Sequence, residues 1–161
     1  HCERPDMIDK KLAPNFWLSE FLHSDTAVRR GIDNTPTQIA LANIETVLAP
    51  GMQRVREVLG VPIVMTSGYR APALNRAVGG SSSSAHMHGL AADFTAAEYG
   101  MPRQVVKRIL EHTPLVRFDQ IIFEGTWVHI GFAEAGKLAR GEVMTASFDA
   151  NGIVTYSHGV A

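Results

Sequence analysis

Three side chains that can bind a metal ion lie far apart along this chain, and its fold has to bring them together. Residues 84–93 read SAHMHGLAAD and offer His86, His88 and Asp93. His129 follows 36 residues after Asp93, within the sequence WVHIGF. Two imidazoles and one carboxylate leave the fourth position of a tetrahedral zinc ion open for water, which is typical of catalytic sites. The pattern therefore indicates one catalytic Zn²⁺ ion and a hydrolase.

The residues alone do not choose between the two histidines of the first cluster. On a strand at residues 127–132, alternation places His129 opposite the apolar face. A lone histidine in such a position more often has a structural role. Binding of a metal ion by His129 is favoured here only because the cluster at residues 84–93 offers further ligands. Asp93 lies an odd number of residues from both His86 and His88, so a straight strand puts it on the same face as neither. Gly89 can supply the turn that brings a histidine and Asp93 to one ion.

Composition points to an ordinary globular domain. The chain has 161 residues, 45% apolar and 19% charged, which suits one domain over residues 1–161 with a substantial core. A net charge of -1 gives no reason to expect a nucleic acid or an anionic membrane as partner. No window approaches the ~20 apolar residues of a membrane span, and the first thirty residues lack the apolar core of a signal peptide. We expect a monomer made in the cytoplasm without a signal peptide and without membrane insertion.

The first residues are expected to lie outside the fold. Residues 1–6 are interpreted as a disordered or added leader, with Met7 as a candidate native start. Cys2 has no partner cysteine, which excludes a disulfide within the chain. Metal or redox use of Cys2 is not expected.

Turn and capping signals predict where the N-terminal elements begin and end. The sequence NTPTQ at residues 34–38 predicts a helix that begins at Pro36, with Thr35 as its cap. Pro50 and Gly51 should break or kink the helical run, and Gly60 should end it. A buried strand is expected at residues 62–66, and a short helix or turn at residues 16–22.

The C-terminal half reads mainly as strands. Hairpins are predicted around residues 125–126 and 151–152, the second at an Asn-Gly pair. The order of helices and strands favours an α+β fold, with N-terminal helices packed on a mainly antiparallel sheet. The further predicted elements are strands at residues 90–95, 118–124, 127–132, 143–148 and 153–156, and a helix at residues 102–112.

Several short motifs surround the candidate ligands. They are SGYR at residues 67–70, Asn75, Gly79 and Gly80, the S-x-H-x-x-G-x-A-x-D string at residues 84–93, and WVH at residues 127–129. Together they resemble the zinc D-alanyl-D-alanine peptidase family, which includes bacterial carboxypeptidases and phage endolysins and shares its fold with the hedgehog signalling domain. The segments FWLSEFLHSDTA and GIDNTP resemble phage-encoded members. The resemblance implies a hedgehog/DD-peptidase-like arrangement.

The resemblance also assigns the metal ligands. It implies His86 as the first ligand, Asp93 as the second and His129 as the third. His88 would then lie beside the ligands or face the substrate. The alternative for His88 is an exposed bystander.

The catalytic base departs from the commonest family pattern. Many members carry Glu three residues before the last ligand, where this chain has Thr126. The nearest carboxylate is Glu124, five residues before His129, and some members carry their base at this position. Glu124 is therefore the candidate base, with a plain hairpin-turn carboxylate as the alternative.

The resemblance places a substrate-binding and catalytic arginine at Arg70. Its guanidinium fork suits a carboxylate or a developing oxyanion, and the alternative is a solvated surface arginine. Ser84 is expected to order the ligand loop or bind substrate, and Tyr69 to line the cleft. The remaining histidines, His23, His112 and His158, are expected to be surface or structural.

The function implied is a zinc-dependent peptidase that cleaves peptidoglycan stem peptides, as a phage or prophage endolysin. It would act on the cell wall or periplasm after release, or as part of a virion. One alternative is a cellular D-alanyl-D-alanine carboxypeptidase. Another, of a different class, is a non-enzymatic zinc-stabilised binding module.

Overall fold

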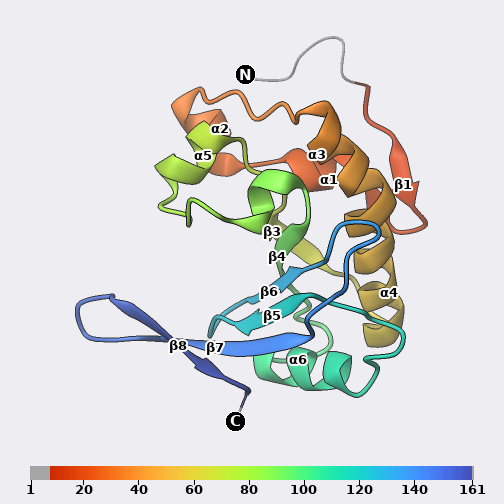
Figure 1. Cartoon of the computed structure of the whole chain (residues 1–161), viewed down its shortest axis with the longest axis vertical. Coiled ribbons are helices and arrows are strands. Elements are labelled where there is room, and N and C mark those ends of the chain that lie inside the picture. Colours follow the sequence, from red (N-terminus) through yellow and green to blue (C-terminus); the bar gives the residue numbers. More distant parts are fainter. Residues whose placement is uncertain (1–7, 161) are drawn as a thin grey trace.

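A computed structural model describes residues 8–160 of the chain, so the predicted leader and Cys2 lie outside the described residues. Helices dominate the first half of the fold and one large sheet the second (Figure 1). The elements are β1 (Lys11–Ala13), β2 (Phe16–Trp17), α1 (Leu18–Leu22), α2 (Asp25–Arg30), α3 (Gln38–Asn43), η1 (Ile44–Leu48), α4 (Ala49–Leu59), β3 (Val64–Ser67), α5 (Pro72–Ala77), η2 (Ala85–His88), β4 (Ala91–Thr95), α6 (Pro102–Leu110), β5 (Gln120–Phe123), β6 (Val128–Gly131), β7 (Glu142–Phe148) and β8 (Val154–His158).

The main sheet has the strand order β3-β4-β6-β5-β7-β8. Every neighbouring pair is antiparallel except β5 and β7, which are parallel. The α+β class and the mainly antiparallel sheet are thus confirmed. Both predicted hairpins form, β5–β6 and β7–β8. Within residues 8–160, no helix combines the length and apolarity needed to cross a membrane.

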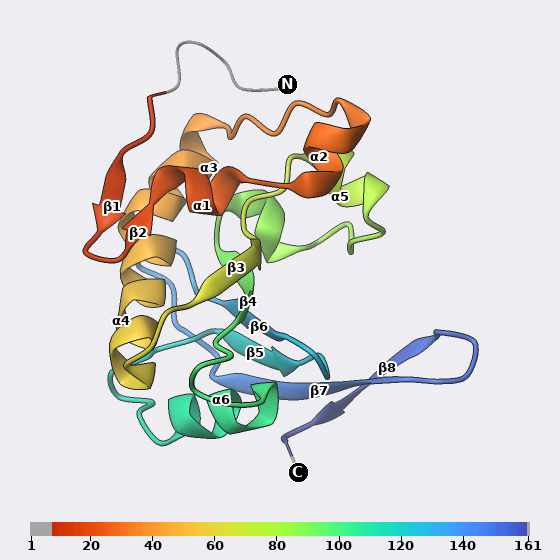
Figure 2. The same cartoon turned by 180° about the vertical axis from the view of Figure 1, so that it is seen from behind.

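Alternation along the central strands separates a core face from an open face. Ala92, Ile121, Val128 and Ile130 are fully buried on the core face, where α6 packs on β5 and β6 and against α4 (Figures 1 and 2). His129 lies between two of these buried residues in sequence, and its side chain therefore points to the opposite face. The predicted orientation of His129 is confirmed.

The helix predicted from Pro36 begins two residues later, at Gln38. Its cap is Thr37, whose hydroxyl accepts a hydrogen bond from the Ala40 N–H at 3.1 Å. Thr35 does not cap the helix, because its hydroxyl and its N–H both donate to the Asp33 carboxylate, at 2.6 and 2.9 Å. The predicted cap was therefore wrong, because a local side-chain turn competes for Thr35.

A break or kink was predicted at Pro50 and Gly51, and the helical run is not broken there. The chain passes from α3 through the π-helical segment η1 into α4. The Ala49 N–H bonds to the Ile44 carbonyl five residues back, and Pro50 then lies in the first turn of α4. The wider turn accommodates a residue that lacks an N–H. Gly60 ends α4 with φ +70°, as predicted.

The strand predicted to be buried at residues 62–66 is an edge strand. β3 begins at Val64, which is 61% exposed, and pairs only with β4. The sequence PIVMT has the composition of a central strand. Burial was wrongly predicted, because the number of neighbouring strands depends on tertiary topology.

Gly89 makes the turn between His86 and Asp93. It ends η2 with φ +69°, a left-handed conformation that favours glycine. A Cβ atom at this position would lie 2.5 Å from the Ala40 carbonyl oxygen. Gly89 therefore fixes both the direction of the chain and the packing of η2 on α3.

We expect Gly89→Ala to destabilise the protein more than Gly31→Ala. Gly31 has a similar φ of +66° but no atom within 4 Å of an added Cβ, so both variants share the ~1–2 kcal/mol conformational cost. Only Gly89→Ala adds a steric conflict with backbone. Urea unfolding of both variants measures the difference, and equal losses of unfolding free energy would contradict the assigned packing.

Candidate metal centre

His86 is held rigidly in η2 with one ring nitrogen directed at Asp93. The residue is 2% exposed, and its N–H donates to the hydroxyl of Ser84 at 3.2 Å. Its Nδ1 lies 2.7 Å from the carbonyl oxygen of Gly68 and donates to it. That bond leaves the lone pair on Nε2, the arrangement that metal-binding histidines commonly have.

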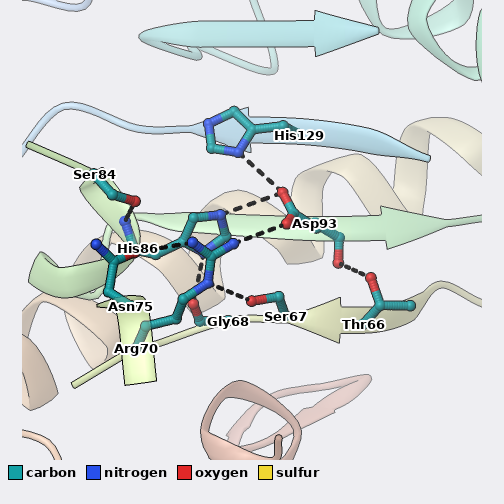
Figure 3. A network of polar contacts seen from close by, with 9 residues as sticks. All are labelled: Thr66, Ser67, Gly68, Arg70, Asn75, Ser84, His86, Asp93 and His129. Atoms are coloured by element: carbon teal, nitrogen blue, oxygen red, sulfur yellow. Dashed lines mark hydrogen bonds and ion pairs between the residues drawn. The ribbon is translucent and has the colours of Figure 1, made fainter. Parts of the chain in front are cut away.

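Asp93 and His129 face each other across neighbouring strands. They are paired in the register of β4 and β6. Asp93 Oδ1 lies 3.0 Å from His129 Nδ1 and 3.3 Å from His86 Nε2 (Figure 3). The two imidazole rings meet edge to face, with centroids 5.1 Å apart. One carboxylate oxygen thus lies between two ring nitrogens.

The three side chains suit a divalent metal ion. One ligand atom from each of His86, Asp93 and His129 lies within 4.8 Å of the others. Bonds of about 2.0–2.1 Å in a tetrahedral zinc site keep ligand atoms roughly 3.3 Å apart, which agrees with the two contacts of Asp93. His88 is exposed and does not belong to this group, although its backbone carbonyl accepts a hydrogen bond from Asn43. Of the two histidines in the first cluster, His86 is therefore the one that lies with Asp93 and His129.

Burial and the shared carboxylate determine the charges in the site. Burial by itself would raise the pKa of Asp93, but hydrogen bonds with His129 and His86 outweigh it and hold that pKa well below its usual range. Burial lowers the pKa of His86, despite the opposing effect of Asp93. Both shifts favour the deprotonated forms that bind metal ions.

Arg70 bonds to the second oxygen of the Asp93 carboxylate. Its Nη2 donates to Asp93 Oδ2 at 3.3 Å, its Nε to Ser67 Oγ at 3.0 Å, and its Nη1 to Asn75 Oδ1 at 3.1 Å. The side chain is 14% exposed, so Arg70 is not a solvated surface arginine. It also borders a hollow of about 290 Å³ whose other walls come from α2, β3 and α5. Its contact with substrate stays a prediction.

Two asparagines fix the loops around Arg70, and neither was assigned a role from the sequence. Asn75 bonds to Arg70 and donates to the Ser81 carbonyl at 2.8 Å. Asn34 donates to the Tyr69 carbonyl and accepts from the Ala71 N–H, at 3.0 and 2.7 Å. Their presence in the motifs around the site was the available signal, but their partners are 5 to 37 residues away.

Glu124 lies on the same face of the sheet as His129, next to the metal centre. It follows β5, and its N–H bonds to the Trp127 carbonyl, so the β5–β6 ladder continues to this residue. Ile122 pairs with His129, and Glu124 is the next residue on the same face, about 7 Å along the strand. Burial and the charge of Asp93 raise the pKa of Glu124, while His129 lowers it. Its position is consistent with the predicted base.

Ser84 and Tyr69 have structural positions. Ser84 caps η2 through the bond to His86, which fits the predicted role in ordering the ligand loop. Tyr69 is 2% exposed and belongs to the hydrophobic core. A side chain buried there does not line a cleft, so its position disagrees with the predicted substrate contact.

A family model described as Peptidase M15 matches residues 14–131, which is well over half of the 161 residues. The chain belongs to this family. Its members are zinc-dependent metallopeptidases, and every residue of the candidate metal centre lies within the matched range. A search of curated proteins found no match.

We expect His86→Ala and His129→Ala to lower zinc affinity by more than ~100-fold, because each removes a direct ligand. His88→Ala is the matched control and should bind zinc as the wild type does, since His88 is exposed and outside the ligand group. Competition with a chromophoric chelator measures the three affinities. Equal losses for His86→Ala and His88→Ala would overturn the ligand assignment.

Proposed function

We propose that this chain is a zinc peptidase that hydrolyses peptide bonds in the stem peptides of bacterial peptidoglycan, as a phage or prophage endolysin. The observation that carries the proposal is the convergence of His86, Asp93 and His129 on one position. Arg70 bonds to the shared carboxylate, and Glu124 is the next residue after Ile122 on the same face of the sheet. Family membership supports the reaction class.

The side chains around the metal position can divide the work of peptide hydrolysis. A bound zinc ion would supply the Lewis acid and lower the pKa of a water molecule to about 7. Glu124 can take a proton from the attacking water on its carboxylate and pass it to the leaving amine. Its raised pKa suits both transfers, because the protonated form becomes accessible nearer to neutral pH.

The hydrogen bonds of Arg70 favour an enzyme that cleaves internal peptide bonds over one that removes a terminal residue. A carboxypeptidase needs a cation that is free to bind the terminal carboxylate of its substrate. The three nitrogens of the Arg70 guanidinium already bond to Ser67, Asn75 and Asp93. We therefore assign Arg70 to holding Asp93 in place.

We expect Glu124→Gln to keep zinc affinity while lowering kcat by about 10²–10⁴-fold, the usual contribution of a general base. Glu98→Gln is a matched control, because Glu98 is exposed and lies outside the metal centre. Steady-state kinetics together with zinc titration separate the two effects. A Glu124→Gln enzyme with wild-type turnover would remove Glu124 from the mechanism.

The decisive experiment is digestion of purified peptidoglycan by the chelated and the zinc-restored protein, with mass spectrometry of the products. We expect cleavage that stops with chelator, returns with zinc and leaves new internal amino groups. Release of free D-alanine alone would instead favour the carboxypeptidase. An intact wall despite one bound zinc per chain would overturn the enzymatic proposal and favour the binding module.

A further inference from the structure

The β7–β8 hairpin adds a surface beyond the part of the chain that the family model matches. The match ends at Gly131, before β7 begins at Glu142. The hairpin projects from the body of the molecule in both views (Figures 1 and 2). Every residue of β8 is exposed, and the apolar side chains Val154 and Tyr156 are among them.

Strand register connects this hairpin to the metal centre. His129 pairs with Ile122, Ile122 pairs with Met144, and Met144 pairs with His158. Residues paired directly across strands project to the same face of a sheet. One row of side chains therefore leads from the metal ligand His129 across β5 and β7 to β8.

A second row leads from Glu124 to Tyr156. Phe123 pairs with Thr145, so Glu124 and Ala146 follow at the same level on their strands. Ala146 in turn pairs with Tyr156, a residue that is 52% exposed. Burial and the charge of Glu124 raise the pKa of the Tyr156 phenol, which agrees with their placement on one face.

We propose that the β7–β8 hairpin extends the substrate-binding surface, with Tyr156 and Met144 contacting the part of the substrate peptide that lies beyond the metal centre. This inference rests on the proposed function. The aromatic ring and the thioether offer apolar contact, and the neutral phenol offers one hydrogen-bond donor to a peptide carbonyl. Such groups suit an uncharged stretch of peptide.

The distance across the sheet makes this contact depend on substrate length. β8 lies three strand positions from β6, about 14 Å at roughly 4.8 Å per position. An extended peptide covers that distance with about four residues of ~3.3 Å each. A peptide with about four residues beyond the metal centre therefore reaches β8, whereas a dipeptide ends before it.

The test measures binding of a soluble muropeptide with a complete stem peptide to metal-free protein, so that no cleavage interferes. We expect Tyr156→Ala to weaken binding at least fivefold, and Tyr156→Phe to show how much of that loss belongs to the hydroxyl. Thr155→Ala is the matched control on the other face of β8 and should bind as the wild type does. Binding by Tyr156→Ala within twofold of the wild type, or no binding by either protein, would overturn the inference.

Kinetics of the zinc-loaded protein provide a second readout and separate the two proposals. Tyr156→Ala should raise KM for stem peptides at least fivefold, with kcat changed less than twofold. An unchanged KM for stem peptides would overturn the inference while zinc-dependent cleavage still supports the peptidase. Weakened muropeptide binding without cleavage by the wild type would instead support the surface and overturn the peptidase.

Discussion

The carboxylate of Asp93 is the group on which the geometry of the site depends. One of its oxygens lies between His86 and His129, and the other accepts a hydrogen bond from Arg70. Four separate segments, η2, β4, β6 and the turn after β3, therefore meet at one side chain. The interactions with the histidines and Arg70 compensate the cost of burying this charge, and they hold the three ligand atoms at spacings that suit a metal ion.

The strands of the main sheet set the spacing of Asp93, His129 and Glu124. The β4–β6 register sets Asp93 opposite His129, and the β5–β6 ladder sets Glu124 one step further along. The same register continues through β7 into β8 and brings Tyr156 to the level of Glu124. Because backbone hydrogen bonds fix these positions, the spacing of Asp93, His129 and Glu124 does not rely on flexible loops.

Local signals predicted those parts of the fold that neighbouring residues control. The predicted Asn-Gly hairpin formed because its turn requires one residue with positive φ, and Gly152 has φ +77°. The prediction that the helix begins at Pro36 was wrong, because Thr35 donates a hydrogen bond to Asp33 instead of capping the helix. The prediction of a buried strand at residues 62–66 was wrong, because an apolar sequence does not reveal how many strands will flank it.

The sequence by itself determined the ligand types, the turn at Gly89 and the outward direction of His129, because these follow from side-chain chemistry and from the period of two along a strand. Only the tertiary structure gathered His86 with Asp93 and His129, buried Tyr69 in the core and bonded Arg70 to Asp93. It also carried one face of the sheet from His129 to Tyr156. These outcomes depend on contacts between residues that lie far apart in the chain. The distances between such residues are set when the strands pair and the helices pack, and no local sequence pattern encodes them.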